Sequence, residues 1–201
     1  MSIYQFLPPC NLLTQHTNYV WQEGIFTSEE LDRIEKIGDA LKSSEGKAGN
    51  KNNQIETNLD VRKCKVAWMA NTPETEFVYN KLAEYINFAN AKYYDFDLFG
   101  FVEDFQYTVY DGSESHYGWH LDMPASGNMP YRKLSFVLQL SDPADYEGGN
   151  LELYTSSKPT CMEKKRGISH LFPSYLLHRV TPVTKGIRKT LVVWVNGNRF
   201  K

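Results

Sequence analysis

The sequence has few cysteines, no long apolar run and almost no net charge, and each lack argues against a class of protein. Cys10, Cys64 and Cys161 are odd in number, far apart and without metal-ligand spacing. We therefore expect reduced thiols in a cytoplasmic protein, and from the first five residues we expect no secretory leader. No apolar segment approaches the length of a membrane span. A formal net charge of −2 offers no broad attraction for nucleic acid, so we expect neither nucleic acid nor membrane as a partner. The oligomeric state is not indicated.

The composition is that of a folded globule. Of the 201 residues, 41% are apolar and 14% aromatic, which argues against disorder and for a sizeable hydrophobic core. We expect a single domain over residues 1–201. Its first part, about residues 1–97, would supply helices and outer strands, and about residues 98–201 would form the core.

Helix signals are confined to the first part. Thr27 and Glu30 resemble a capping box, which predicts a helix over about residues 28–43. Thr72-Pro73 would supply the N-cap and first residue of a second helix. Residues 43–60 are rich in Ser, Gly, Asn and Lys, and they read as a loop that is either a disordered connection or a lid over an active site.

Strand signals follow one another from residue 98 onward. Turn residues separate runs at 100–110, 118–122, 134–141, 150–155, 168–172, 177–182 and 188–196. Two helices followed by about seven short strands predict a two-sheet β-sandwich supported by helices.

The first candidate site is the segment with His120 and Asp122. Side chains at positions i and i+2 of a strand point to the same face, so both can reach one metal ion. Two imidazoles and one carboxylate form the facial triad of non-haem Fe(II) oxygenases, and His178 would supply the second imidazole. Alternatively, the His-x-Asp pair arises by chance. His116 and His120 stand four apart, as in helical zinc sites, although the residues between them are poor helix formers.

The last two strand candidates suggest how His178 joins this site. We expect residues 177–182 and 188–196 to form an antiparallel hairpin that turns at residues 184–186. In that register His178 and Arg188 share one face, so Arg188 would lie near the metal. On its own, an arginine at a strand end would be read as a surface cation.

Three further side chains belong to the same candidate pocket. The planar guanidinium of Arg188 suits a carboxylate, because it binds bidentately and cannot lose its charge. Tyr110 ends the strand before His120, and its hydroxyl would add a directional hydrogen bond. Trp194 shares the predicted inward face with Arg188. For Tyr110 and Trp194, the alternative is an ordinary place in the hydrophobic core.

Several motifs in the second half of the chain occur together. They are Tyr110-Asp111-Gly112, Tyr117 to Asp122, Arg132 to Ser135, Leu140 to Pro143, Tyr146 to Leu151, Phe172 to Ser174, and His178 to Val183 with Arg188 and Trp194. In this order they resemble the Fe(II)- and 2-oxoglutarate-dependent dioxygenases, specifically the prolyl 4-hydroxylase-like branch of PKHD-type hydroxylases. The resemblance covers about half of the chain.

This resemblance implies a mainly β fold with flanking α-helices, whose core is a double-stranded β-helix, or jelly roll. It implies three iron ligands that are also the catalytic residues: His120, Asp122 and His178. It also implies that Arg188 binds 2-oxoglutarate. In animal relatives that hydroxylate proline, a tyrosine on the strand after the His-x-Asp segment helps bind oxoglutarate. Here Gln139 holds that place, so Gln139 joins Tyr110 and Trp194 as a candidate cofactor-binding residue.

The resemblance implies a hydroxylase that uses Fe(II), 2-oxoglutarate and O₂, with ascorbate as an optional reductant, and releases succinate and CO₂. The substrate would be a prolyl or other side chain in a protein or peptide, or a small molecule. Two alternatives remain open. One is a non-catalytic metal-binding jelly-roll module, and the other is a cupin-like metalloenzyme that does not use 2-oxoglutarate.

Overall fold

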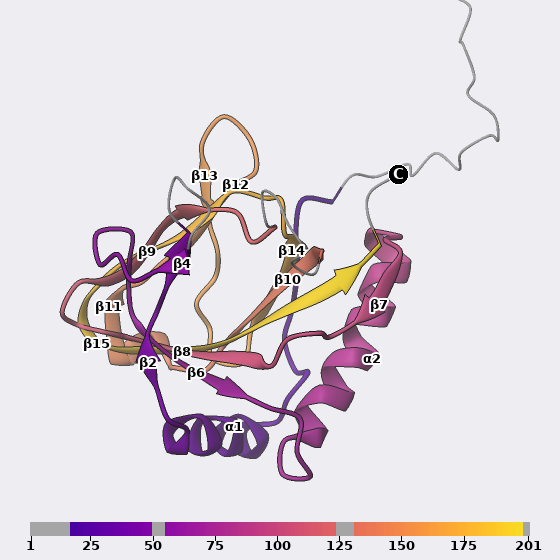
Figure 1. Cartoon of the computed structure of the whole chain (residues 1–201), viewed down its shortest axis with the longest axis horizontal. Helices are drawn as coiled ribbons and strands as arrows, with labels where there is room; N and C mark the ends of the chain where they lie inside the picture. The colour runs from indigo at the N-terminus through magenta and orange to yellow at the C-terminus, as the bar shows by residue number, and fades with distance from the viewer. Residues whose placement is uncertain (1–16, 50–54, 124–130, 199–201) are drawn as a thin grey trace, which may run out of the picture.

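The computed structural model describes residues 17–49, 55–123 and 131–198. It contains the helices α1 (Ser28–Ala40) and α2 (Glu76–Tyr93) and the short 3-10 helix η1 (Pro143–Asp145) (Figure 1). The early strands are β1 (Val20–Gln22), β2 (Ser44–Glu45), β3 (Ala48–Gly49), β4 (Ile55–Glu56), β5 (Arg62–Lys63), β6 (Lys65–Met69) and β7 (Leu98–Gly100). The later strands are β8 (Phe105–Asp111), β9 (Ser115–His120), β10 (Arg132–Gln139), β11 (Tyr146–Gly148), β12 (Leu151–Tyr154), β13 (Pro159–Cys161), β14 (Ser169–Pro173) and β15 (His178–Gly197).

Apart from β3 and β4, which form a separate two-stranded sheet, the strands form two antiparallel layers that share β15. In the major sheet the order is β1-β14-β10-β15-β8-β6-β2, and β7 also pairs with β15. In the minor sheet β15 pairs with β9, β11 and β12, while β5 extends β9 and β13 extends β12. This arrangement confirms the expected mainly β fold with flanking helices. The division into one domain over residues 1–201 stays a prediction.

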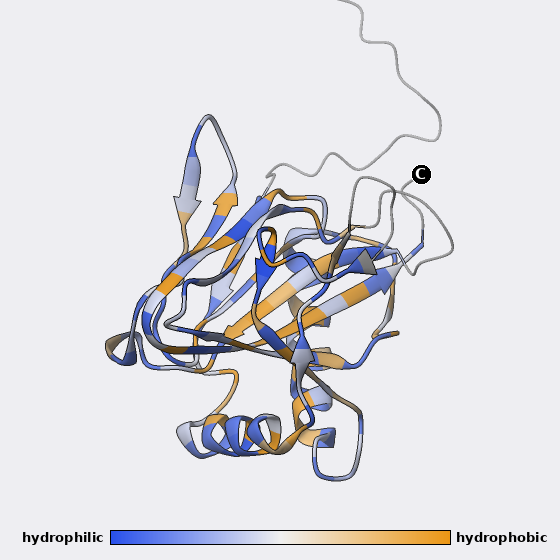
Figure 2. Cartoon of the chain, turned by 60° about the vertical axis from the view of Figure 1, so that its left-hand side comes forward, coloured by the Kyte–Doolittle hydropathy of each residue, from blue (hydrophilic) through white to orange (hydrophobic). Residues whose placement is uncertain are grey.

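Two buried clusters hold the layers together. Both helices cover the outer face of the major sheet, where Ile34 of α1 and Leu82 of α2 join Phe136 and Leu191 in one cluster (Figures 1 and 2). The second cluster lies on the other face of the major sheet, toward the minor sheet, and includes Val137, the immediate neighbour of Phe136. Because neighbouring side chains of a strand point to opposite faces, β10 contributes to both clusters. Neither helix is long and apolar enough to cross a membrane, nor is any other helix within the described residues.

Helix α1 begins where the sequence predicts. Thr27 Oγ1 accepts a hydrogen bond from the Glu30 amide at 3.3 Å, and Glu30 accepts one from the Thr27 amide at 2.8 Å. The helix ends at Ala40, three residues earlier than predicted, because Leu41 adopts an extended conformation. Gly38 is required where the helix meets β8, since a Cβ there would lie 2.4 Å from the Tyr107 ring.

Helix α2 begins later than predicted. Thr72-Pro73 does not form its first turn, because the helix starts at Glu76 with Thr75 at the N-cap. The carbonyl of Thr72 accepts hydrogen bonds from the amides of Thr75 and Glu76. The proline signal therefore marks a turn that leads into the helix.

The predicted hairpin at residues 177–196 is wrong, because β15 is one strand of 20 residues. It runs antiparallel to β8 and β9, which succeed each other in the same direction. Arg188 pairs with Tyr110 in the major sheet, and His178 pairs with His120 in the minor sheet. These strands form a long ribbon that passes from one sheet to the other.

Gly186 lies at a bend in this ribbon and not at the chain reversal that a hairpin would require. Gly186 has a φ of 72°, and a Cβ at this position would lie 1.9 Å from the carbonyl oxygen of Asp145. Gly112 lies alongside, and its Cβ would come 3.0 Å from the Lys185 backbone. Residues 184–186, the predicted turn, therefore lie where the ribbon of β8, β9 and β15 passes from one sheet to the other.

The predicted loop at residues 43–60 is partly ordered as strand. β2 pairs with β6, and β3 pairs with β4. The Gly46 amide donates to the Cys64 carbonyl at 2.8 Å, which fixes this segment against the chain before β6. Residues 50–54 lie outside the described residues, so the choice between a lid and a disordered connection stays open.

Candidate active site

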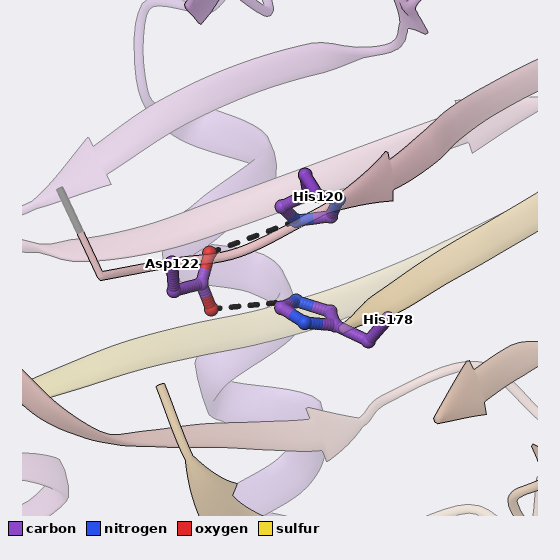
Figure 3. A group of neighbouring side chains, drawn as sticks. All are labelled: His120, Asp122 and His178. Atoms are coloured by element: carbon purple, nitrogen blue, oxygen red, sulfur yellow. Dashed lines mark ion pairs between the residues drawn. The ribbon is translucent and has the colours of Figure 1, made fainter. Parts of the chain in front are cut away.

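The three residues proposed as metal ligands meet at one point (Figure 3). His120 ends β9, Asp122 follows two residues later, and His178 begins β15. His120 Nε2 lies 3.6 Å from Asp122 Oδ1, and His178 Nε2 lies 3.4 Å from Asp122 Oδ2. One ligand atom from each residue lies within 4.8 Å of the other two, an arrangement that can hold a metal ion. His116 is not part of this group, and it lies in a strand where the zinc alternative requires a helix.

Hydrogen bonds orient all three side chains. Nδ1 of His120 contacts the Gly118 carbonyl and Nδ1 of His178 contacts the Leu176 carbonyl, each at 2.8 Å. A carbonyl can only accept, so each Nδ1 carries the proton and each Nε2 is left to bind a metal. Ser135 Oγ donates to Asp122 Oδ2 at 2.7 Å. The hydrogen-bonding groups that would hold metal ligands in a fixed orientation are therefore present.

The electrostatics favour a cation at this point. Burial lowers the pKa of His120 to about 3, and the neighbouring His178 acts in the same direction. Burial opposes ionisation of Asp122, but His178 and His120 outweigh it and hold the pKa of this carboxyl far below its ordinary value. Burial favours neutral His178, but Asp122 outweighs that effect and raises the pKa of His178. An ionised carboxylate between two imidazoles is a donor set that suits a divalent transition metal.

A cavity of about 410 Å³, its opening to solvent included, lies between the two sheets beside these residues. The inner face of β15 contributes six residues to its lining: His178, Val180, Arg188, Thr190, Val192 and Trp194. His120, Asp122 and His178 line the same cavity, as does Tyr110. The predicted metal ligands and the predicted anion-binding arginine therefore face one space, although the hairpin that led to this expectation does not exist.

Arg188 is a buried cation without a carboxylate partner among the described residues. It is 3% exposed, and its Nε has no hydrogen-bond partner. Its guanidinium lies 5.4 Å from the centre of the Tyr110 ring, and the Tyr146 hydroxyl is a polar neighbour. An uncompensated charge in a protein interior is costly, so it points to an anion that is absent from the chain itself.

A glycine makes room for this arginine. Gly149 has a φ of 59°, and a Cβ at this position would lie 2.9 Å from Cδ of Arg188. Gly149 therefore leaves the space that the Arg188 side chain occupies.

The remaining sequence candidates occupy different places. Trp194 lines the cavity, and its Nε1 is buried without a hydrogen-bond partner among the described residues. Gln139 does not line the cavity. Its Nε2 donates to the Ser141 carbonyl at 3.1 Å and to the Tyr146 hydroxyl at 3.0 Å.

A buried stack that the sequence did not indicate lies beside the predicted metal ligands. The Tyr117 ring lies on the His120 ring, with centroids 3.5 Å apart, and the Arg62 guanidinium lies 4.4 Å from the Tyr117 ring centre. Arg62 donates hydrogen bonds to Cys64 Sγ, the Lys47 carbonyl and Gln106 Oε1. No short motif marks Arg62, because it reaches the cavity through the pairing of β5 with β9.

Comparison with known proteins places the second half of the chain in a family context. Residues 105–196 match the model of the 2OG-Fe(II) oxygenase superfamily. A PKHD-type hydroxylase of Hyphomonas neptunium is 42% identical over 87 residues, which cover 42% of this chain and 39% of the relative. One from Synechococcus sp. (strain CC9605) is 45% identical over 80 residues, covering 39% of this chain and 36% of that relative. The family resemblance drawn from the sequence is thus confirmed, over a match that spans about two fifths of the length of these relatives.

Solved structures show the same fold over most of the chain. A prolyl hydroxylase from Trichoplax adhaerens, in complex with a peptide fragment of hypoxia inducible factor, superposes with a TM-score of 0.73 at 19% identity. That match covers 90% of this chain and 84% of the other. A prolyl-4-hydroxylase from Pseudomonas putida gives a TM-score of 0.66 at 17% identity, covering 93% and 96%. The core is therefore the double-stranded β-helix of the prolyl hydroxylases.

Proposed function

We propose that this protein is an Fe(II)- and 2-oxoglutarate-dependent dioxygenase that hydroxylates its substrate. The carrying observation is that the metal-binding group of three and the buried, uncompensated Arg188 line one cavity. His120, Asp122 and His178 would hold the iron, and Arg188 would bind the distal carboxylate of 2-oxoglutarate. This pairing distinguishes the proposal from a non-catalytic jelly roll or a cupin-like enzyme, since neither needs a buried cation that faces the metal.

The chain's own residues prepare the site for this chemistry. The iron and 2-oxoglutarate would supply the oxidation, in which O₂ places one oxygen atom in a substrate C–H bond and the other in succinate, with release of CO₂. The carbonyls of Gly118 and Leu176 keep both Nε2 atoms free for the metal. The fork of Arg188 fixes the far end of a dicarboxylate. Tyr110, Val192 and Trp194 line the remaining space and limit access of water.

The proposed substrate is a prolyl or other side chain of a protein or peptide, with a small molecule as the second candidate. The peptide in the Trichoplax complex and the prolyl hydroxylase fold support the first choice. A cytoplasmic location is part of the proposal, and the free thiols of Cys64 and Cys161 are consistent with it.

Anaerobic titration tests the proposal. Fe(II) and then 2-oxoglutarate are added to the full chain, and the visible charge-transfer band of the chelate is followed. We expect the band with the wild type and with His116→Ala, whose side chain lies outside the metal group, and no band with His178→Ala. A band of equal strength in the His178 variant would refute the iron assignment. Peptides and metabolites are then screened for stimulated release of succinate.

A further inference from the structure

Within the part of the chain that the structure describes, the hydrogen-bonding partners of Tyr146 leave its hydroxyl proton without an acceptor. Tyr146 lies on β11 and is 4% exposed, and its hydroxyl interacts with the side chain of Arg188. Arg188 lines the cavity, whereas Tyr146 does not. Its hydroxyl accepts a hydrogen bond from Gln139 Nε2 at 3.0 Å. A guanidinium carries only donors, so Arg188 cannot take the proton either.

The orientation of Gln139 is fixed by a third group. Its Nε2 also lies 3.1 Å from the Ser141 carbonyl oxygen, which can only accept. The amide nitrogen, and not the amide oxygen, must therefore face both Ser141 and Tyr146. As a consequence Gln139 donates to Tyr146, and the phenolic proton stays free for another acceptor. Burial raises the pKa of Tyr146, which keeps that proton in place.

We propose that Tyr146 is a ligand-binding residue, whose hydroxyl donates a hydrogen bond to the carboxylate that pairs with Arg188. Gln139 is then the positioning residue, because its amide orients the Tyr146 hydroxyl. This inference rests on the proposed function, since the carboxylate is the distal one of 2-oxoglutarate. It changes the role expected for Gln139. The amide does not replace a tyrosine by binding the cofactor itself; it orients a tyrosine of β11, the next strand along the chain.

The packing around Arg188 supports this assignment. A Cβ at Gly149 would contact both Cδ of Arg188, at 2.9 Å, and the Tyr146 ring, at 3.3 Å. The tyrosine ring and the arginine stem therefore lie side by side over one glycine. An anion that binds the guanidinium comes next to the hydroxyl, and a hydrogen bond to an ionised group is about twice as strong as a neutral one.

A pair of keto acids separates ligand binding from a merely structural role. The iron-loaded full chain is titrated anaerobically with 2-oxoglutarate and with 2-oxopentanoate, which has the same metal-binding end but no distal carboxylate. For Tyr146→Phe we expect 2-oxoglutarate to bind about tenfold more weakly or worse, with binding of 2-oxopentanoate unchanged. Tyr107→Phe is the matched control, because its hydroxyl bonds Asp39 on the helix side of β8, and it should bind both acids like the wild type.

A double-mutant cycle tests the part played by Gln139. Gln139→Met removes the donor, and we expect it to weaken 2-oxoglutarate binding in the wild type but to add nothing in the Tyr146→Phe background. Additive losses would show that Gln139 binds the cofactor itself. Equal losses for both keto acids, or none, in Tyr146→Phe would overturn the inference. A wild type that binds neither acid would instead overturn the proposed function.

Discussion

Replacement of Arg188 by methionine should move stability and binding in opposite directions. The guanidinium is 3% exposed and has no carboxylate partner among the described residues. Its burial costs several kcal/mol, offset by about 1 kcal/mol from the Tyr110 ring and about 1 kcal/mol from Tyr146. Arg188→Met keeps most of the side-chain volume and removes the charge. We expect the metal-free variant to be more stable than the wild type, with a free energy of unfolding about 1–3 kcal/mol higher.

The same change should cost most of the affinity for 2-oxoglutarate. Loss of one partner of a buried ion pair costs about 3–5 kcal/mol, which corresponds to at least a hundredfold rise in Kd. Urea unfolding of metal-free protein gives the first quantity, and anaerobic titration of the iron-loaded protein gives the second. Arg179→Met is the control on the same strand, because Arg179 is partly exposed and already paired with Glu152. If Arg188→Met instead lowers the free energy of unfolding as much as the truncation of a large core side chain does, the guanidinium stabilises the fold. That result would refute the expected opposite effects on stability and binding.

Three further substitutions address the metal and the glycine beneath the arginine. His178→Ala should abolish iron binding and succinate release, as measured by metal analysis and turnover. Ser135→Ala removes the donor to the carboxylate ligand and should weaken iron binding about 10–100-fold, whereas unchanged affinity would contradict that role. Gly149→Ala should cost about 1–3 kcal/mol of stability and displace Arg188. Gly24→Ala, also at positive φ but in open space, should keep wild-type binding of 2-oxoglutarate.

Local signals in the sequence predicted the elements that depend on neighbouring residues. The capping box at Thr27 set the start of α1, and turn residues marked off most of the longer strands. Elements that depend on distant partners were missed. β5 has two residues, and its pairing with β9 brings Arg62 into the cavity. No periodicity can appear in so short a segment, so only the fold reveals it.

The structure brings the predicted iron ligands and Arg188 to one cavity, although the hairpin predicted to connect them is wrong. The predicted hairpin placed His178 and Arg188 on one face, and both side chains do line the cavity, although they lie on one strand. What the sequence could not supply was the bend at Gly186. A glycine of positive φ serves a tight turn and a bulge equally well, and here the pairing of Tyr146 with Gly186 decides between them.

The shared ribbon has a consequence for how the two halves of the site are held. His178 faces His120 across one end of the ribbon, and Arg188 faces Tyr110 across the other. Arg188 is ten positions after His178 on β15, and the bend between them brings both side chains toward one cavity. A ligand that binds the iron at one end and the guanidinium at the other would therefore clamp the bend itself. Its length must match the span that the bend sets, which is a physical basis for choosing a dicarboxylate of one length over its shorter and longer homologues.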